Sequence, residues 1–594
     1  MSIPRPEYPR PQFVRSEWLC LNGEWDFEID NGDSGLERGL REHPLTGKIN
    51  VPFCPESSLS GIHHEDFMEA VWYRRQVAIP ESWAGKKVLL HFQAVDHDTT
   101  VWVNGVEVVR HRGGFTPFTA DLEGLAIPGK TITIIVRARD DRRAPQPRGK
   151  QSPLFDNYGC MYTRTTGIWQ TVWLEPVPLT YLGRPRLTPD VSLGLIRLEQ
   201  PVNGQHAGLN LRATLKDDKG VICQETIPAD QSFIPAVDLL IPADRRRLWA
   251  PGQPYLYDVT IELVTADGQV VDCANSYAGL RSITIDGKAI KINGAVIFQR
   301  LVLDQGYYPD GILTAPTDEA LRRDIQLSME AGFNGARLHQ KVFEERFLFH
   351  ADQMGYIVWG EFPDWGCSGR GPVEDHQQPT GSYITQWLEA ITRDYSHPCI
   401  VGWCPLNETW QPLTDRITTL DDVTRGMFLA VKALDRTRPV LDTSGYSHRV
   451  PEIDVYDCHD YEQDPAKFAR THSGLADGKP FLNTSDGKPM SIPYKGQPYF
   501  VSEFGGIWWR AGGASAKDSW GYGDRPKTIE DYYQRFNDLC GILLDNPLMF
   551  GYCYTQLTDV YQEQNGIYTF DRQSKFDLTH IRASQQRRAA IEQH

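Results

Sequence analysis

Short alternating stretches of apolar and polar residues dominate the first part of the chain, from about residue 18 to residue 180. Examples are KVLLHFQAV, TTVWVNGVEVV and TITIIVRARD, with Gly, Pro or Asp between them. A period of two is typical of half-buried strands, and Asn104-Gly105 between two such runs is a strong hairpin signal. Because long helical periodicity is missing, the pattern predicts an all-β sandwich, of the jelly-roll type, over residues 1–180.

The same alternation continues in a smaller unit from about residue 181 to residue 285. Its clearest runs are LNLRATLKDD and YLYDVTIELVTADGQVVD, and Asp267-Gly268 in the second run indicates another turn. Roughly 100 residues of short strands predict an immunoglobulin-like β-sandwich. The Cys…Trp…Cys spacing of antibody domains is missing, so the prediction concerns only the architecture.

Helix-like and strand-like segments alternate after about residue 286. The helix-like segments are TDEALRRDIQLSMEAG, FEERFLFHADQMG, YITQWLEAITRDYSHP, VTRGMFLAVKALDRTRP and TIEDYYQRFNDLCGILLDNP. The strand-like segments are KINGAVIFQRL, FNGARLH, YIVWGEF, IVGWCPL, VLDTSG, VYDCHDY, PYFVSEF and LMFGYCYTQL. Such alternation indicates parallel βα units, and eight strands in about 300 residues favour a (β/α)₈ TIM barrel over an open sheet. We therefore predict a TIM barrel over residues 286–594.

Composition narrows the class of protein only a little. The 594 residues carry a net charge of 61 − 77 = −16, which disfavours nucleic acid or an anionic membrane as the main partner. The 11 Cys are odd in number and have no regular spacing, which argues against a disulfide framework or a zinc ribbon. The start, MSIPRPEYPRPQF, lacks the apolar core of a signal peptide, and no run of about 18 apolar residues occurs. A cytoplasmic location is the default expectation.

Polar residues end nearly every strand of the predicted barrel. In a TIM barrel the carboxyl ends of the strands carry the chemistry, so these residues are expected to meet at one mouth. Glu408 follows the fourth strand and Glu503 the seventh, which places two carboxylates across that mouth. Glycoside hydrolysis needs such a pair, one protonated and one ionised. The alternative is that either Glu forms a structural salt bridge. The residues at these strand ends are Arg337, His339, Glu361, Asn407, Glu408, His459, Asp460, Tyr461, Glu503, Gln556 and Asp559.

The segments WCPLNETW and FVSEFGG resemble glycoside hydrolase family two, which contains β-galactosidases, β-glucuronidases and β-mannosidases. The resemblance extends along the chain in FQAVDHDTTVWVNGVEVVRHRGGFTPF, TGIW, LWAPGQPYLYDVTIEL, AGLRSITID and YTQLTDVYQEQNGIYTFDR. It implies that Glu408 is the acid/base, that Glu503 is the nucleophile of a retaining double displacement, and that Asn407 holds the sugar 2-hydroxyl. It also implies a sugar-binding-type first domain.

Further site residues follow from the strand ends and from the resemblance. Arg337 and His339 would border the site, although a structural ion pair is an equal alternative for the Arg. His459 and Tyr461 follow strand six, where a phenol could hydrogen-bond Glu503 and tune its ionisation. Trp365, and Trp508 with Trp509, are candidate walls for the sugar, with core packing as the alternative.

A polar loop in the first sandwich, RDDRRAPQPRGKQ, is too rich in Pro and charge for a strand. In the family that the chain resembles, this domain sends a loop to the barrel mouth. Asp141, Arg148 and Lys150 are therefore candidates for substrate contact, and a solvated surface loop is the alternative.

Departures from the family bear on the sugar. β-Glucuronidases carry an Asn-x-Lys motif for the sugar carboxylate, and no Asn in this chain is followed two places later by Lys. This departure disfavours a glucuronide. By its frequency in the family alone we expect a β-galactoside first, and we leave open a β-galactofuranoside, arabinoside, mannoside or glucuronide. A non-catalytic carbohydrate-binding protein is the alternative class. The chemistry requires no cofactor or metal, although a Mg²⁺ or Na⁺ ion near the site stays open, as does a homo-oligomer.

Overall fold

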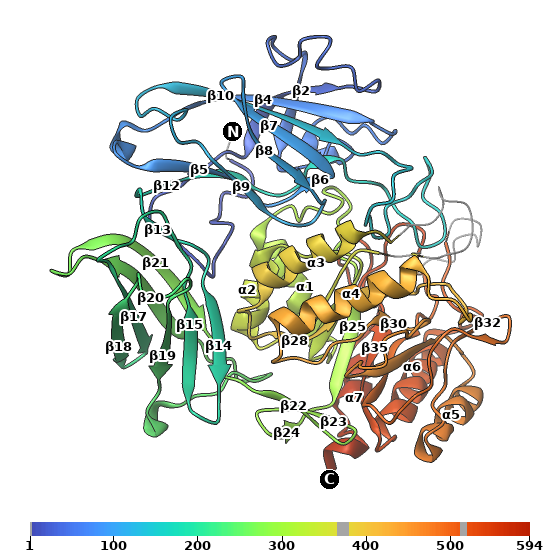
Figure 1. Cartoon of the computed structure of the whole chain (residues 1–594). Coiled ribbons are helices and arrows are strands. Elements are labelled where there is room, and N and C mark those ends of the chain that lie inside the picture. The colour runs from blue at the N-terminus through green and yellow to red at the C-terminus, as the bar shows by residue number, and fades with distance from the viewer. Residues whose placement is uncertain (1–2, 365–366, 368–378, 511–518, 594) are drawn as a thin grey trace.

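The computed structural model describes residues 3–364, 367, 379–510 and 519–593. It contains antiparallel sheets in its first half and a large parallel sheet near its C-terminus (Figure 1). The predicted multidomain, β-rich architecture with a C-terminal parallel sheet is therefore confirmed. Among the described residues, no helix combines the length and apolar character needed to span a membrane.

Two antiparallel sheets face each other in the first unit and enclose an apolar core that includes Trp25, Phe92 and Ile134. The predicted hairpin at Asn104-Gly105 is confirmed, since both residues have positive φ, 50° and 81°, between β7 and β8. One sheet contains β1 (Leu19–Cys20), β12 (Val172–Val177), β5 (Lys87–Phe92) and β9 (Phe118–Asp121). The other contains β3 (Gly47–Val51), β2 (Gly23–Ile29), β4 (Ala70–Ala78), β10 (Thr131–Arg139), β7 (Asp98–Val103) and β8 (Val106–Arg112). A small pair joins β11 (Gly167–Ile168) to β6 (Val95–Asp96).

The second unit has its own apolar core, which includes Leu198, Leu211 and Ile261. Gly268, with φ of 87°, makes the predicted turn between β20 and β21. Its strands are β13 (Tyr181–Leu182) with β16 (Val202–Asn203); β14 (Arg186–Asp190), β15 (Leu195–Glu199) and β19 (Ala236–Leu240); and β18 (Gly220–Pro228), β17 (Asn210–Asp217), β20 (Tyr257–Val264) and β21 (Val270–Ala278).

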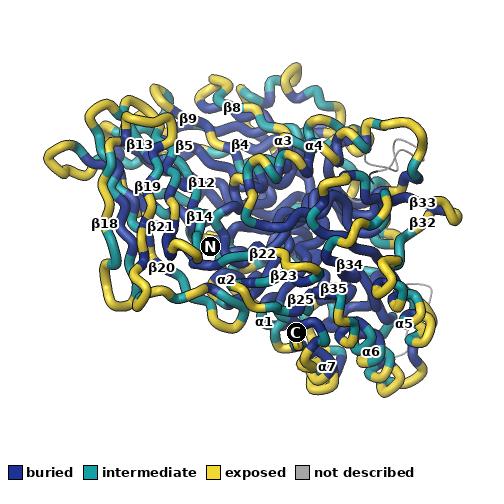
Figure 2. Tube along the Cα trace, turned by 60° about the horizontal axis from the view of Figure 1, so that its bottom comes forward, coloured by how far each residue is buried: buried dark blue, intermediate teal, exposed yellow. Residues whose placement is uncertain are grey.

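A seven-stranded parallel sheet forms the centre of the last unit, in the order β28-β27-β26-β25-β35-β34-β31. Its strands are nearly all buried, as apolar runs covered on both faces must be (Figure 2). They are β25 (Gln299–Asp304), β26 (Gly335–Leu338), β27 (Ile357–Glu361), β28 (Ile400–Cys404), β31 (Tyr456–Asp460), β34 (Tyr499–Gly505) and β35 (Met549–Thr555). Two strands in separate short pairing, β29 (Leu406–Asn407) and β30 (Thr443–Ser444), are also parallel.

The expected first barrel strand, KINGAVIFQRL, divides into two structures. Its first half lies in a small antiparallel sheet, and only the second half joins the parallel sheet as β25. Asn293 and Gly294, with φ of 55° and 79°, make a hairpin turn within the small sheet. The small sheet contains β22 (Ile283–Asp286), β23 (Ala289–Ile292) and β24 (Ala295–Val296), and another pair joins β32 (Thr484–Ser485) to β33 (Lys488–Pro489).

Helices connect the parallel strands, and side-chain caps define where several of them begin. Thr528 and Asp531 form a capping box at α6, and Thr317 accepts a hydrogen bond from the backbone of Ala320 at α1. Gly355 ends α2 in the left-handed conformation. The helices are α1 (Asp318–Glu330), α2 (Glu345–Met354), α3 (Gly381–Asp394), α4 (Thr419–Leu434), α5 (Pro465–Ser473), α6 (Ile529–Leu544) and α7 (Leu578–Gln586).

Candidate active site

The carboxyl ends of the parallel strands bring polar side chains from distant parts of the sequence together. His459 of β31 lies beside Glu503 of β34 in the strand register, and Asn407 of β29 lies beside Ser444 of β30. Glu408 follows Asn407 directly, and its backbone N–H donates to the Ser444 carbonyl at 2.9 Å. A buried polar cluster therefore lies where these strands end.

Glu408 and Glu503 lie within a few ångströms of each other. Carboxylate oxygens of the two residues and a ring nitrogen of His459 all lie within 4.8 Å of one another. The closest contact joins His459 Nδ1 to Glu408 Oε1 at 2.6 Å, while His459 Nε2 lies 3.5 Å from Glu503 Oε1. These side chains hydrogen-bond to one another, so the group is a network of side chains.

Glu408 has a strained backbone, with φ of 47°. Left-handed backbone is unfavourable for a residue with a Cβ, and at functional sites it persists only where the surroundings enforce it. Here the hydrogen bond to Ser444 on one side and the buried Asn407 on the other fix the turn. The strain aims the Glu408 carboxylate at His459.

Glu503 is held by two donors. The Tyr461 hydroxyl donates to Oε2 at 2.5 Å, and the Arg337 guanidinium donates to Oε1 at 3.1 Å. Tyr461 is itself fixed by stacking on Tyr522, with ring centroids 3.5 Å apart. Both oxygens of Glu503 therefore have fixed partners, which favours an ionised and oriented carboxylate.

Arg337 ties several strand ends together from a fully buried position. Besides Glu503 it donates to Glu361 Oε2 at 2.7 Å and to Asn407 Oδ1 at 2.9 Å. It also donates to the Ser502 carbonyl at 2.7 Å, so all of these contacts are with protein groups, as in the ion-pair alternative. The Nδ2 group of Asn407 is buried and has no hydrogen-bond partner among the described residues.

The electrostatics of the two carboxylates depend on His459. Burial raises the pKa of Glu408, but the hydrogen bond and charge of His459, and then the charge of Lys150, lower it to about 2. Burial likewise raises the pKa of Glu503, but the charges of His459, His339 and Arg337 lower it. Burial lowers the pKa of His459, but Glu503 and Glu408 raise it above its ordinary value. The three groups therefore share their protons.

The loop of the first sandwich reaches this cluster. Gly149, with φ of 58°, donates its N–H to the Pro363 carbonyl at 3.2 Å, and a Cβ on it would lie 2.3 Å from the Gln340 carbonyl oxygen. Lys150 comes next and is buried; the charges of Glu563, Glu503 and Glu408 raise its pKa against burial. No described residue forms a hydrogen bond or an ion pair with its ammonium.

Two further residues proposed from that loop, Arg148 and Asp141, have contacts within it. Arg148 donates to the carbonyls of Arg142, Asp141 and Ala144, and so closes the loop on itself. The Asp141 side chain is exposed and accepts from the N–H of Arg143. Of the three candidates, Lys150 is therefore the one that the structure brings to the two carboxylates.

The candidate aromatic walls have mixed positions. Trp508 is half-buried, and its indole N–H has no partner among the described residues. Trp365 lies outside the described residues. His339 is buried, its Nδ1 lies 2.9 Å from Glu361 Oε1, and its Nε2 has no partner within the described part of the chain.

Several residues of the cluster are absent from the sequence prediction. Ser444 and Asp457 lie behind His459, and the Tyr446 ring lies 5.5 Å from the His459 ring. Cys160 lies close enough to Glu408 and Lys150 for their charges to affect the pKa of its thiol. The position of Ser444 in VLDTSG, at a strand end, was a usable signal. Nothing in the sequence marks Cys160, since its loop has no periodicity.

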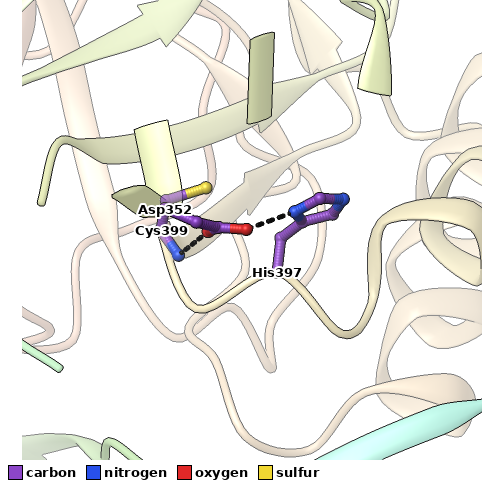
Figure 3. A group of neighbouring side chains, drawn as sticks. All are labelled: Asp352, His397 and Cys399. Atoms are coloured by element: carbon purple, nitrogen blue, oxygen red, sulfur yellow. Dashed lines mark hydrogen bonds and ion pairs between the residues drawn. The ribbon is translucent and has the colours of Figure 1, made fainter. Parts of the chain in front are cut away.

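A second buried group, Asp352, His397 and Cys399, has the residue types of a metal site (Figure 3). Its carboxylate is already occupied: Oδ2 accepts from His397 Nδ1 at 2.5 Å and from Tyr277 at 2.8 Å, and Oδ1 accepts from the Cys399 N–H at 2.8 Å. Burial also raises the pKa of the Cys399 thiol well above its ordinary range, which disfavours the thiolate that a metal needs. This group fixes the end of α2 against the start of β28.

Comparisons with known proteins indicate the family of the chain. Residues 19–143 match the family model "Glycosyl hydrolases family 2, sugar binding domain", and residues 180–281 match the model "Glycosyl hydrolases family 2". A β-glucuronidase of Paenibacillus borealis is 27% identical over 432 residues, covering 68% of this chain and 69% of that protein. A β-galactosidase of Thermoanaerobacter pseudethanolicus is 27% identical over 447 residues, covering 71% of this chain but 54% of that protein, so the match spans about half of its length.

Solved structures share the fold along nearly the whole chain. A β-glucuronidase from Ruminococcus gnavus in complex with D-glucuronic acid superposes with a TM-score of 0.76 at 19% identity, covering 99% of this chain and 100% of that one. A β-glucuronidase of an uncultured Clostridium species gives a TM-score of 0.75 at 21% identity, covering 96% and 97%. At such identities the likeness concerns the fold.

Proposed function

The chain belongs to glycoside hydrolase family 2 and is a glycoside hydrolase, and we propose that it removes a terminal β-linked sugar with retention of configuration. The observation that carries the proposal is the approach of Glu408 and Glu503, whose carboxylate oxygens lie within 4.8 Å. Retaining enzymes keep their two carboxyl groups about 5–5.5 Å apart, whereas inverting enzymes need about 6.5–9.5 Å for a water molecule. The short distance supports retention.

In this proposal Glu503 is the nucleophile. Its two fixed donors, Tyr461 and Arg337, keep it ionised and aimed. It attacks the anomeric carbon while the bond to the leaving oxygen breaks, and that oxygen takes a proton from Glu408. Water then cleaves the glycosyl–Glu503 ester, giving its proton back to Glu408.

Asn407 is the proposed partner of the sugar 2-hydroxyl. Its carbonyl oxygen is used by Arg337, so the amide is oriented, and its buried NH₂ group lacks a partner among the described residues. An oriented, unpaired donor beside the two carboxylates supports this role, because a hydrogen bond to the 2-hydroxyl strengthens in the transition state.

We also propose three domains: a jelly-roll sandwich over residues 1–180, an immunoglobulin-like sandwich over residues 181–285, and a TIM barrel over residues 286–594. In this arrangement β30 supplies the fifth barrel strand between β28 and β31. The parallel bridge of Trp403 to Val440 and the bond of Ser444 Oγ to Asp457 Oδ2 at 2.9 Å support that closure. The loop that carries Lys150 completes the pocket for one terminal sugar, which supports exo action.

For the sugar we propose a neutral β-galactoside-like unit first. The site already holds Glu408, Glu503 and Glu361, and Glu563 lies close enough to raise the pKa of Lys150. A sugar carboxylate would be repelled by these groups. A β-glucuronide is the second candidate, because the Lys150 ammonium, which has no partner among the described residues, is available to hold its carboxylate and because several relatives are β-glucuronidases.

A panel of aryl β-glycosides tests the proposal, with galactoside, mannoside, arabinoside and glucuronide pyranosides beside galactofuranoside. The purified chain is expected to release phenol from at least one member, and proton NMR of the first product is expected to show the β-anomer. Glu503→Ala should abolish release while the circular dichroism spectrum stays unchanged. A first product in the α-configuration would contradict retention, and release of nothing by the wild type would favour a carbohydrate-binding protein.

A further inference from the structure

His459 lies between the two carboxylates, and both of its ring nitrogens are engaged by protein atoms. Nδ1 lies 2.6 Å from Glu408 Oε1, and Nε2 lies 3.0 Å from Ser444 Oγ. The ring is fully buried within the cluster. A residue with both nitrogens engaged in this way has its orientation fixed, and its protonation follows from what its partners can donate.

The partners behind His459 set the direction of every hydrogen bond. Ser444 Oγ lies 2.9 Å from Asp457 Oδ2 and 3.2 Å from Ser502 Oγ, and its single hydrogen goes to the carboxylate, which is the closer and stronger acceptor. Asp457 can only accept, because it is ionised beside His448, whose Nε2 lies 3.0 Å from Asp457 Oδ1 and whose Nδ1 lies 2.8 Å from Asp442 Oδ1. Two carboxylates hold the buried His448 as a cation, and they raise its pKa to about 10. Ser444 is thus left as an acceptor toward His459.

Counting hydrogens then leaves one mobile proton. Since Ser444 accepts, His459 Nε2 must donate. The remaining contact, Nδ1 to Glu408 Oε1, contains one proton whether it is written as imidazolium with carboxylate or as neutral imidazole with carboxylic acid. At 2.6 Å this proton needs to move only a fraction of an ångström between the two atoms.

We propose that His459 is a positioning residue that holds the catalytic proton for Glu408. In the free enzyme the proton rests on His459 Nδ1. When the leaving oxygen takes a proton from Glu408, Glu408 receives the Nδ1 proton, so that His459 becomes neutral and Glu408 ends as a carboxylate. When water attacks the glycosyl ester, Glu408 takes the proton of the water and returns it to Nδ1. The inference rests on the proposed glycosidase function.

The charge on Glu503 times this transfer. In the free enzyme the Glu503 carboxylate lies 3.5 Å from Nε2 and stabilises the imidazolium. As Glu503 forms its ester it loses that charge, and the imidazolium loses a partner just when the leaving oxygen needs the proton. No other charged group around the ring changes its charge in this step. The titratable or charged groups around the ring are Glu408 and Tyr446, Glu503, Arg337 and His339, Asp457, and Lys150 of the first sandwich.

His459→Asn tests the proposal, because an Asn amide can hydrogen-bond Glu408 but has no proton that it can transfer. With the aryl glycoside that the wild type hydrolyses best, the basic limb of the kcat/KM profile is expected to move to lower pH. The reason is that the proton must then rest on a carboxyl group, whose ordinary pKa is below that of histidine. A loss confined to structure would lower the profile without moving the limb.

Leaving-group dependence gives the second readout. A 2,4-dinitrophenolate needs little protonation as it leaves, whereas an alcohol needs it fully. We expect His459→Asn to lower kcat for the methyl glycoside roughly 10²-fold or more, within the range for general acid catalysis, and for the dinitrophenyl glycoside by severalfold at most. Equal losses for both substrates would overturn the proposal.

Two further variants keep the test decisive. Ser444→Ala removes the acceptor of Nε2 together with the donor to Asp457, which His448 still holds. If His459→Asn fails to fold, Ser444→Ala should move the basic limb in the same direction by a smaller amount. His472→Asn alters another buried histidine, bonded to Asp460 at 3.1 Å, and should leave the limb unchanged. If the basic limb of Ser444→Ala stays in place, the role proposed for His459 is refuted but the glycosidase function is not. A wild type without activity on any glycoside refutes the proposed function instead.

Discussion

Gly149→Ala tests whether contact between the first sandwich and the barrel builds the site. Gly149 has φ of 58°, and an added Cβ would lie 2.3 Å from the Gln340 carbonyl oxygen, well inside van der Waals contact. That oxygen belongs to backbone and cannot rotate away as a side chain would. The loop must therefore lift, and Lys150 next to it would lose its place beside the carboxylates.

A matched variant separates the clash from the backbone strain. Gly159 lies in the same part of the chain with φ of 50°, but a Cβ there meets nothing within 4 Å. Left-handed backbone costs each Ala variant about 1–2 kcal/mol. Overpacking adds about 1–3 kcal/mol at residue 149 alone. If this additional free energy is relieved by displacing the loop, the fraction of molecules with Lys150 in place falls about 5-fold to 150-fold, since about 1.4 kcal/mol corresponds to a factor of ten.

Steady-state kinetics on the best aryl glycoside measures the effect. Gly149→Ala is expected to lower kcat/KM by one to two orders of magnitude relative to Gly159→Ala, at similar thermal midpoints. Equal kcat/KM for the two variants would refute the reasoning, because it would show that loop contact with Gln340 does not support the site.

Three further predictions concern single side chains. Tyr461→Phe removes the 2.5 Å hydrogen bond to Glu503, and because a bond to a charged group is worth about 1.5–3 kcal/mol, kcat should fall at least about tenfold. The acid limb of the pH profile should move to higher pH, because the ionised carboxylate loses a donor. An acid limb that does not move would contradict this. Lys150→Met should raise KM about tenfold on the preferred substrate, and an unchanged KM across the glycoside panel would exclude substrate contact. The pKa of His448 is raised from 6.5 to about 10, so the stability that its protonation contributes is complete below pH 6.5 and disappears as the pH rises through about 10. The difference in urea midpoint between wild type and His448→Asn should therefore shrink between pH 7 and pH 10. A constant difference would contradict the charged state assigned to His448.

Elements with strong periodicity or local turn chemistry could be predicted from the sequence. The hairpin at Asn104-Gly105 depends on two neighbouring residues that tolerate positive φ, so local sequence suffices. Helix α6 likewise follows from its apolar period and from the cap at Thr528. The first barrel strand was misplaced at its start, because we predicted one strand over KINGAVIFQRL although its Asn293-Gly294 carries the same hairpin signal as Asn104-Gly105.

Residues of the site could be predicted where strand ends determine them, and not where loops do. Glu408 and Glu503 follow apolar runs, and parallel strands bring such ends together. Ser444 and Asp457 matter through a hydrogen-bond direction that depends on the register of β30 and β31, which no spacing encodes. In the loop of the first sandwich, Arg148 and Lys150 look equivalent in the sequence. In the structure Arg148 donates to carbonyl groups of its own loop, and Lys150, after the left-handed turn at Gly149, lies near the two carboxylates.

Charge balance at the barrel mouth links stability to substrate choice. Three buried carboxylates there have cationic partners: Arg337 donates to Glu361 and Glu503, and His459 pairs with Glu408. Lys150 differs, because its ammonium has no hydrogen-bond or ion-pair partner in the part of the chain that the structure describes. A neutral sugar can satisfy it with a hydroxyl and leaves the balance intact. A uronate can also satisfy it, but adds one more anion beside Glu408 and Glu503. We therefore compare the ratio of kcat/KM for galactoside to kcat/KM for glucuronide in the wild type with the same ratio in Lys150→Met. The change in this ratio measures whether Lys150 favours the neutral sugar or the uronate.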